Sequence, residues 1–397
     1  MRVSTLMSHH TAVRTMTSQE DKLLHTMQQV ASGKRVLTPS DDPLASSLSV
    51  NLAQTKSMNA RYAENREIAR QNLSTEEQTL TSVSNMLQDV LTRIVEAGNE
   101  VYSDADRQML AGVLKEMRST LMGLANATDG TGQYLFSGNL GNVAPFDPVM
   151  GTINPGVQGT RDIQVTQSRV MPSASTAVEV FNRVAPGAQV YVAQADLANT
   201  GSVTFKGPEV ADVTQVLDET FTISFDDTSG SWEVVINYGA NEIRLPYESG
   251  RNIEFAGLRL TLEGEPAAGD TITISPAEVN LFPDLDRLIE VLEAPTAGDP
   301  GAMARLRNEL ATANRKINLV LDNVLTVRAS IGARMNELDA LDEEGSYRDL
   351  IYASQLSQLE DLDYRQASSD LAVRSMALQA AELAYMKVQN LGLFSRR

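Results

Sequence analysis

The chain has 397 residues, with 33 Lys and Arg against 51 Asp and Glu, so its formal net charge is −18. It contains no Cys, which excludes a disulfide framework, a Cys-ligated zinc site, an iron–sulfur cluster and a thiol nucleophile. The acidic total argues against an electrostatic nucleic-acid binder, because such proteins normally carry a basic surface. The length allows two or three domains.

Proline is absent from two long tracts. Of the 14 prolines, none lies between Leu44 and Ala144, and none follows Pro300. A proline inside a helix costs about 3 kcal/mol. Both ends of the chain are therefore predicted to be largely helical.

The first predicted helix covers residues 3–31, where apolar residues recur at spacings near three, four and seven: Leu6, Val13, Met16, Leu23, Leu24, Met27 and Val30. Gly33 is expected just after its C-terminus. Asp41 and Asp42 are expected to cap free N–H groups before a second helix, with Pro43 in its first turn. Charged residues interrupt the apolar positions, so we expect neither a cleaved signal peptide nor a membrane span.

Heptad repeats predict long coiled-coil seams. The first has Leu73, Leu80, Leu87, Ile94 and Val101 at a, with Glu76, Val83, Val90, Ala97 and Asp104 at d. The second has Leu310, Ile317, Val324, Ile331 and Leu338 at a, with Ala313, Val320, Val327, Arg334 and Leu341 at d. The third has Tyr364, Leu371, Leu378 and Tyr385 at a, with Ala367, Arg374, Ala381 and Val388 at d. Residues 343–346 are predicted to link the last two runs, and each Arg at d to face a partner.

Residues 150–281 have a different pattern. They hold 12 of the 25 Gly and 7 of the 14 Pro, and they carry 7 basic against 17 acidic residues. Alternating apolar residues predict strands around residues 221–225 and 232–238, joined by a turn at 226–230. A second hairpin is predicted at 252–262, and another strand at 271–274. This segment is therefore predicted to be a β-rich insert.

The predicted fold class is α+β: a long antiparallel helical bundle or coiled-coil rod built from both chain ends, with a β-rich inserted domain. Neither helical half can bury its seam alone, since an amphipathic helix gains most of its stability from packing. We therefore expect both termini at one end of the rod and the insert at the other.

No residue pattern in this sequence predicts an enzyme, a cofactor or a metal site. The three histidines, His9, His10 and His25, are expected on an exposed helix surface, with Asp21 a helical neighbour of His25. The segment 129–132 is rich in Gly but lacks the Lys of a phosphate loop. It is better explained as a turn after a long helix.

Three separated motifs resemble the flagellin family of bacterial flagellar axial proteins. They are Arg2–Ser4 followed by Ser32–Val36 and Pro39–Pro43, then Ile331–Leu338, and finally the C-terminal helix through Leu391–Phe394. Within the family, the segment 125–146 and the run from Asp363 to Gln389 are similar to the hook–filament junction branch. The insert matches no motif of the family, and the Ser395–Arg397 tail departs from the usual ending.

The resemblance implies an organisation, partners and a location. Residues 1–35 and 358–397 would form inner-tube terminal helices, 36–146 and 282–357 a helical rod, and 147–281 an exposed insert. The partners would be a hook-associated protein on the hook side, flagellin on the filament side, copies of the chain itself and an export chaperone on the C-terminal helix. The protein would be extracellular in the flagellum, after type III export without cleavage.

Two alternatives remain open. The chain could be filament flagellin itself, which abundance would distinguish from a junction protein. Less favoured is an adhesin-like module carried on a flagellin-type rod, with Trp232 as a stacking platform for a carbohydrate. Trp232 shares a strand face with Val234, Ile236 and Tyr238, which instead favours a place in the core of the insert.

Overall fold

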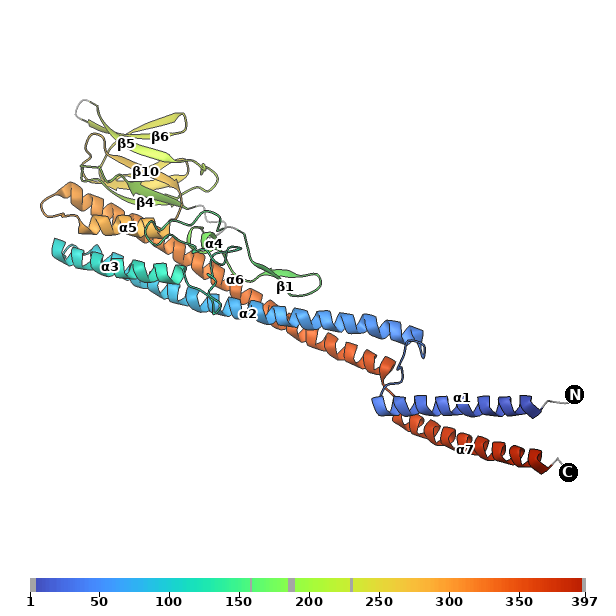
Figure 1. The fold of residues 1–397 in the computed structure, drawn as a ribbon. Helices are drawn as coiled ribbons and strands as arrows, with labels where there is room; N and C mark the ends of the chain where they lie inside the picture. The colour runs from blue at the N-terminus through green and yellow to red at the C-terminus, as the bar shows by residue number, and fades with distance from the viewer. Residues whose placement is uncertain (1–4, 158, 185–189, 229–230, 395–397) are drawn as a thin grey trace. The chain divides into compact units, whose positions relative to one another are not determined.

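The computed structural model of the chain describes residues 5–157, 159–184, 190–228 and 231–394. Its helices are α1 (Thr5–Ser32), α2 (Pro43–Ala97), α3 (Asp104–Ala125), α4 (Ala177–Phe181), α5 (Leu281–Glu293), α6 (Pro300–Glu360) and α7 (Tyr364–Phe394) (Figure 1). Two compact units are formed, one by residues 1–64 with 340–397 and the other by 65–339. Helices α2 and α6 each run through both units.

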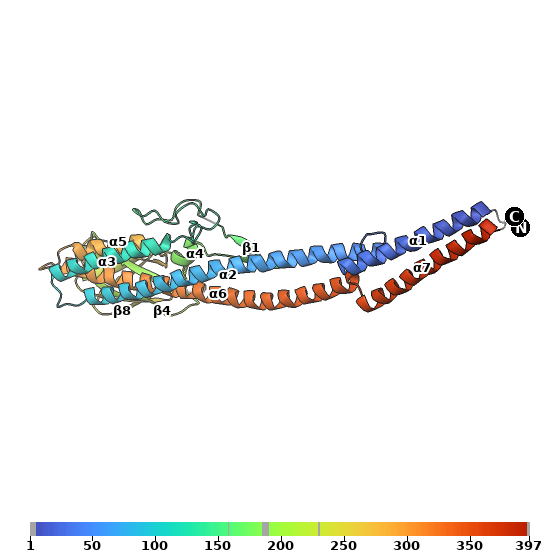
Figure 2. The same cartoon turned by 60° about the horizontal axis from the view of Figure 1, so that its bottom comes forward.

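In the 65–339 unit, α2, α3, α5 and α6 form an antiparallel bundle (Figures 1 and 2). Arg328 of α6 donates to the Oε1 atom of Glu77 on α2 at 2.7 and 3.0 Å, and Lys115 of α3 pairs with Glu293 of α5 at 2.6 Å. The nine seam residues predicted from the heptads are all buried, none more than 7% exposed: Leu73, Leu80, Leu87, Ile94, Leu310, Ile317, Val324, Ile331 and Leu338. These side chains form part of the core of the bundle.

The first predicted seam extends beyond the end of its helix. Helix α2 ends at Ala97, and the a-position residue Val101 is 86% exposed in the connection to α3. Ser103 then caps α3 in a reciprocal capping box with Asp106, which starts a new helix rather than continuing the old one. The proline-free tract also contains non-helical residues after Ala125. There, Asp129 accepts hydrogen bonds from the backbone N–H groups of Thr131 and Gln133, and such local bonds favour turns over helix.

The predicted linker at residues 343–346 is wrong, because α6 continues through it to Glu360. Gly345 is buried there, and its carbonyl accepts a hydrogen bond of 2.9 Å from the side-chain amide of Asn59 on α2. The break instead falls at residues 361–363, where Asp363 accepts from the N–H group of Arg365 and caps α7.

The insert contains two antiparallel sheets that share one hydrophobic core, as a sandwich does. The five-stranded sheet has the order β3 (Tyr191–Ala195), β10 (Thr271–Pro276), β5 (Phe221–Thr228), β6 (Ser231–Tyr238), β7 (Asn241–Pro246). The three-stranded sheet has the order β4 (Thr204–Val210), β9 (Leu258–Glu263), β8 (Asn252–Phe255). A separate hairpin joins β1 (Asp162–Gln164) and β2 (Val170–Pro172). The predicted α+β class, with helical chain ends and a β-rich insert, is confirmed.

The strands predicted in the insert are present, with one change at the first turn. Asp226 and Asp227 belong to β5, where they pair with Glu233 and Trp232, and the expected residues 229 and 230 of the turn lie outside the described residues. Trp232 is half-buried and packs against the shared core. Its indole therefore serves packing, which removes the main reason for expecting a stacking platform.

Polar side chains of α5 and α6 hold the insert to the bundle. Asn308 of α6 is buried, and its amide accepts from the N–H group of Phe205 at 3.1 Å while donating to the carbonyl of Val203 at 2.9 Å. Arg287 of α5 donates to the carbonyl of Ala195 at 2.7 Å. A buried amide that satisfies both a donor and an acceptor fixes the position of β4, because leaving either one unpaired is costly.

Candidate assembly site

Helices α1 and α7 pack side by side in the unit formed by residues 1–64 and 340–397 (Figures 1 and 2). The hydroxyl of Tyr385 lies 2.7 Å from Nε2 of His9, and Arg374 donates to the carbonyl of Lys22 at 3.2 Å. Arg374 occupies a d position of the third heptad run. It therefore contacts α1 of its own chain, and that it faces a partner remains a prediction.

Two helices cannot cover all the apolar side chains that α1 and α7 carry. Among the residues of these helices with described side chains, only Thr26 and Ala367 are buried. Of the predicted assembly residues, Val13 and Met27 are exposed, and Leu23, Val30, Leu371, Leu378 and Tyr385 are half-buried. The side chains of Leu6 and Val388 lie outside the described residues.

A second apolar face lies on α7, at residues that the sequence reasoning did not single out. It consists of Val373, Met376, Leu383 and Met386, which are 50–59% exposed and which we call the α7 stripe. Their spacings of three and seven place them on one side of the helix. Leu24 of α1 is likewise 50% exposed. Contiguous exposed apolar residues of this kind mark interaction surfaces in soluble proteins.

The segment after α1 is bonded to the segment before α7 through the backbone. The N–H group of Arg35 donates to the carbonyl of Glu360 at 2.6 Å, and that of Leu362 donates to the carbonyl of Gly33 at 3.0 Å. Lys34 and Glu360 add an ion pair of 2.9 Å. The positive φ of +71° at Gly33 lets the chain leave α1 at this point. These contacts join residues more than 300 positions apart in the sequence.

Asp41 and Asp42, the acidic pair before α2, both accept hydrogen bonds from backbone N–H groups, but these groups belong to different segments. Asp42 accepts from the N–H group of Ala45 in the first turn of α2, which begins at Pro43. That bond, and then the Arg35 guanidinium, hold the pKa of Asp42 below its usual value. Asp41 accepts from the N–H groups of the preceding loop, chiefly Thr38, which lowers its pKa. The predicted capping of α2 is therefore confirmed for Asp42 but wrong for Asp41, which bonds the loop before the helix instead.

The partner of His25 differs from the one that helical spacing suggested. Nε2 of His25 lies 3.0 Å from a carboxylate oxygen of Asp41, in the loop before α2, rather than bonding Asp21 one turn earlier. Helical spacing could not show this contact, because Asp41 lies outside α1. No cluster of three or more His, Asp or Glu side chains that could hold a metal ion is present among the described residues.

A groove of about 430 Å³ lies between α2 and α6 in the same unit. Its lining combines the apolar side chains of Leu48, Leu52 and Leu359 with amide side chains such as those of Gln355 and Gln358. Leu48 is 47% exposed. Like the α7 stripe, this surface leaves apolar area open to solvent.

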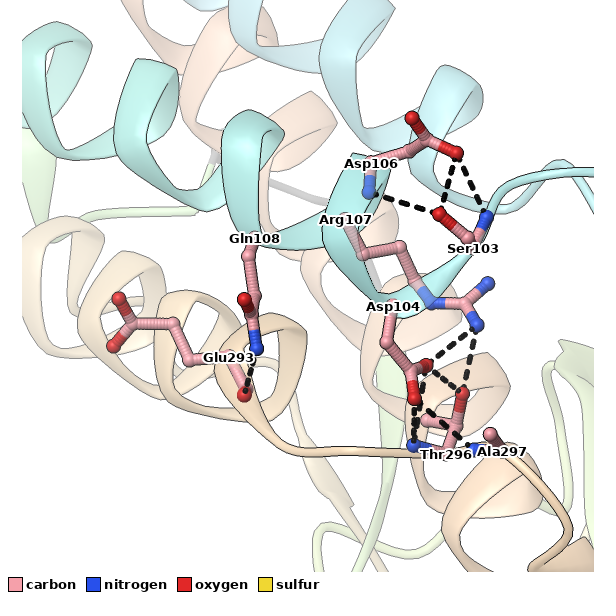
Figure 3. A network of polar contacts seen from close by, with 8 residues as sticks. All are labelled: Ser103, Asp104, Asp106, Arg107, Gln108, Glu293, Thr296 and Ala297. Carbon is pink, nitrogen blue, oxygen red and sulfur yellow. Dashed lines mark hydrogen bonds and ion pairs between the residues drawn. The ribbon is translucent and has the colours of Figure 1, made fainter.

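A network of polar contacts surrounds the N-terminal end of α3 (Figure 3). The sequence did not predict this network. Asp104 accepts from the hydroxyl of Thr296 at 2.7 Å and from Arg107 at 3.0 Å. Thr296 lies between α5 and α6, so the network ties α3 to their connection. These hydrogen bonds, with that from Thr296 the largest cause, lower the pKa of Asp104 to about 2. The contact spans about 190 residues of sequence, and no local pattern could reveal it.

Comparison with known proteins places this architecture in a class. A family model for the N-terminal helical region of bacterial flagellin matches residues 3–140. Flagellar hook-associated protein 3 of Salmonella typhimurium and that of Escherichia coli K12 are each 30% identical over 394 residues, covering 99% of both chains. The protein is thus a flagellin-type structural protein of the bacterial flagellum.

Solved structures of hook-associated protein 3 share this fold. Hook-associated protein 3 of Legionella pneumophila is 25% identical, with a TM-score of 0.69 over 79% of this chain and 98% of that one. The FlgL structure from Xanthomonas campestris is 25% identical, with a TM-score of 0.65 over 73% and 98%. The chain belongs to the flagellar hook-associated protein 3 family. Among the described residues, no helix is both long and apolar enough to cross a membrane.

Proposed function

We propose that this protein forms the junction between hook and filament, by helical assembly with itself and with its neighbours through α1 and α7. The observation that carries the proposal is the exposed apolar surface of this helix pair, on which only two described side chains are buried. Head-to-tail contacts between identical subunits generate rings or helical tubes. Residues 1–35 and 358–397 are the segments proposed to line the inner tube.

The energetics favour burial of these faces by neighbouring subunits. Fully burying a Leu, Met or Val side chain is worth about 1.5–3 kcal/mol, and each residue of the α7 stripe is at least half exposed in the free chain. Several such contacts per subunit are enough to drive association. Segments that depend on a partner for burial are expected to become fully ordered only on assembly.

The proposed partners follow from the position of a junction. A hook-associated protein would contact one side, flagellin the other, and copies of this chain would lie around the ring. The chain would reach the outside of the cell through the flagellar type III apparatus without cleavage, escorted by a chaperone on the C-terminal helix. The exposed stripe on α7 supports a chaperone there, since a helix of this kind fits an apolar groove.

Two other functions are weaker proposals. Filament flagellin would use the same helix pair, but the full-length likeness is to hook-associated protein 3. An adhesin-like module would need an exposed binding surface on the insert, whereas Trp232 packs against the sandwich core. Failure of the isolated insert, residues 147–281, to bind any glycan would count against the adhesin hypothesis.

Deletion and complementation of the gene test the junction role. Cells lacking the protein should assemble hooks but release unpolymerised flagellin into the medium, and the full chain should restore filaments. A chain lacking residues 150–278 is expected to restore motility as well, because the insert is proposed to face outward. Normal filaments in the deletion strain would overturn the junction role, while loss of filament attachment with the shortened chain would show that the insert is part of the junction.

A further inference from the structure

The segment from residue 162 to 176 lies along the bundle as a strap. It comprises the β1–β2 hairpin and the residues that lead into α4. Arg66 of α2 donates to the carbonyl of Val165 at 3.0 Å. Arg169 of the strap forms a two-bond ion pair with Glu337 of α6, at 2.6 and 2.9 Å. The strap is thus fastened to both long helices by charged side chains.

A third fastening is buried. Glu76 of α2 is fully buried, and both of its carboxylate oxygens lie 3.2 Å from the backbone nitrogen of Ser175, which donates to them. Glu76 occupies a d position in an otherwise apolar part of the seam. A carboxylate is expensive to bury unless it is paired and well hydrogen-bonded, so this residue calls for a reason beyond packing.

The groups around Glu76 compensate the charge of its buried carboxylate only in part. Two charged groups act on it, Arg334 of α6 and Glu179 of α4, with opposite effects. Among the described residues, no ion pair joins Glu76 to a basic side chain, and Nη1 of Arg334 is buried without a hydrogen-bond partner. Burial therefore dominates and raises the pKa of Glu76 to about 7.

We propose that Glu76 is a proton-linked latch for the strap: when it ionises, residues 173–176 detach more often from α2 while the bundle stays folded. Detachment admits water to the carboxylate and to the buried Nη1 atom of Arg334. The ion pair between Arg169 and Glu337 raises the pKa of Arg169 and lowers the pKa of Glu337, so it persists as Glu76 ionises and the hairpin end of the strap stays in place. This inference concerns the internal dynamics of the chain and is independent of the proposed junction role.

The direction and size of the effect follow from proton linkage. A group whose pKa is higher in the closed state than in the open state favours closure at low pH, and this preference is lost as the pH rises through the closed-state value. Taking the ordinary value of 4.5 for the open state and about 7 for the closed state, opening should increase about tenfold between pH 6 and pH 8.

Hydrogen exchange on the full chain tests the latch. The protection of peptides covering residues 173–176, corrected for the intrinsic pH dependence of exchange, should fall about tenfold from pH 6 to pH 8. Peptides from β9 and β10 should keep their protection over the same range. In Glu76→Gln, which has a similar shape but cannot ionise, the fall should disappear.

Two further variants test the charges and do not depend on the folding of Glu76→Gln. Glu179→Gln removes a nearby negative charge and should move the midpoint of the change to lower pH. Arg334→Gln removes the positive charge and should move it to higher pH. An equal fall in wild type and Glu76→Gln, a midpoint unmoved by both neighbouring variants, or a fall shared by the whole bundle would each overturn the proposal.

Discussion

The α7 stripe gives the sharpest test of the assembly site, through the substitution Leu383→Asp. Leu383 is 56% exposed in the free chain. Fully burying a leucine is worth about 1.5–3 kcal/mol. Covering the exposed 56% of the Leu383 side chain therefore contributes about 0.8–1.7 kcal/mol at each subunit contact. Leu383→Ala should therefore weaken association by up to roughly tenfold per contact. Leu383→Asp also loses the burial energy of the leucine side chain. In addition, association must supply the several kcal/mol needed to remove the aspartate carboxylate from water.

We expect Leu383→Asp to fold normally but to leave the deletion strain without attached filaments, because both proposed occupants of this face, a neighbouring subunit and the export chaperone, would have to bury the charge. Circular dichroism and thermal melting of the purified chain should match wild type, because the side chain lies in solvent before assembly. The matched control is Val95→Asp, which places the same charge at a position of α2 that is 69% exposed and should restore motility. Wild-type motility from Leu383→Asp, exported at wild-type level, would refute the assignment of this face to an interface.

Other predictions concern the remaining surfaces and the core. Leu378→Asp, at the half-buried side of α7, should also abolish assembly while the 65–339 unit keeps its melting transition. Limited proteolysis of the free chain should cut α1 and α7 before α2 and α3; equal resistance would contradict ordering on assembly. Leu80→Ala should lower the free energy of unfolding by about 2.7–5 kcal/mol, measured by denaturant titration. Asp104 contributes stability above its ordinary pKa of 3.8 that is lost as the pH falls toward about 2, so Asp104→Asn should flatten acid unfolding in that range.

Periodicity predicted the elements whose packing repeats regularly. The heptad leucines and isoleucines of α2 and α6 were identifiable because a seam between two long helices needs an apolar residue every three to four positions. The strands of the insert were identifiable because one face of each contributes to a core. Gly33 and Pro43 marked a helix end and a helix start through backbone constraints that belong to these residue types.

One error arose where a tertiary contact outweighed the local signal, and another where a local capping motif interrupted the heptad pattern. The pair of glutamates with Gly345 looked like a linker, yet Gly345 lies buried inside α6 against Asn59 of α2. Val101 fitted the heptad, but the capping box at Ser103 starts a new helix and leaves Val101 in solvent. Sequence spacing cannot register a neighbour that lies hundreds of positions away.

By itself, the sequence determined the class of the fold, the family resemblance and the residues of the helical seam, because these depend on patterns that repeat along the chain. Only the tertiary structure decided which apolar faces remain open and which polar groups meet. The α7 stripe is a surface because the packing of α1 on α7 leaves these four side chains 50–59% exposed. Glu76 is a buried carboxylate because Ser175, 99 residues away, closes over it, and solvent exposure is a property of the assembled chain rather than of any segment.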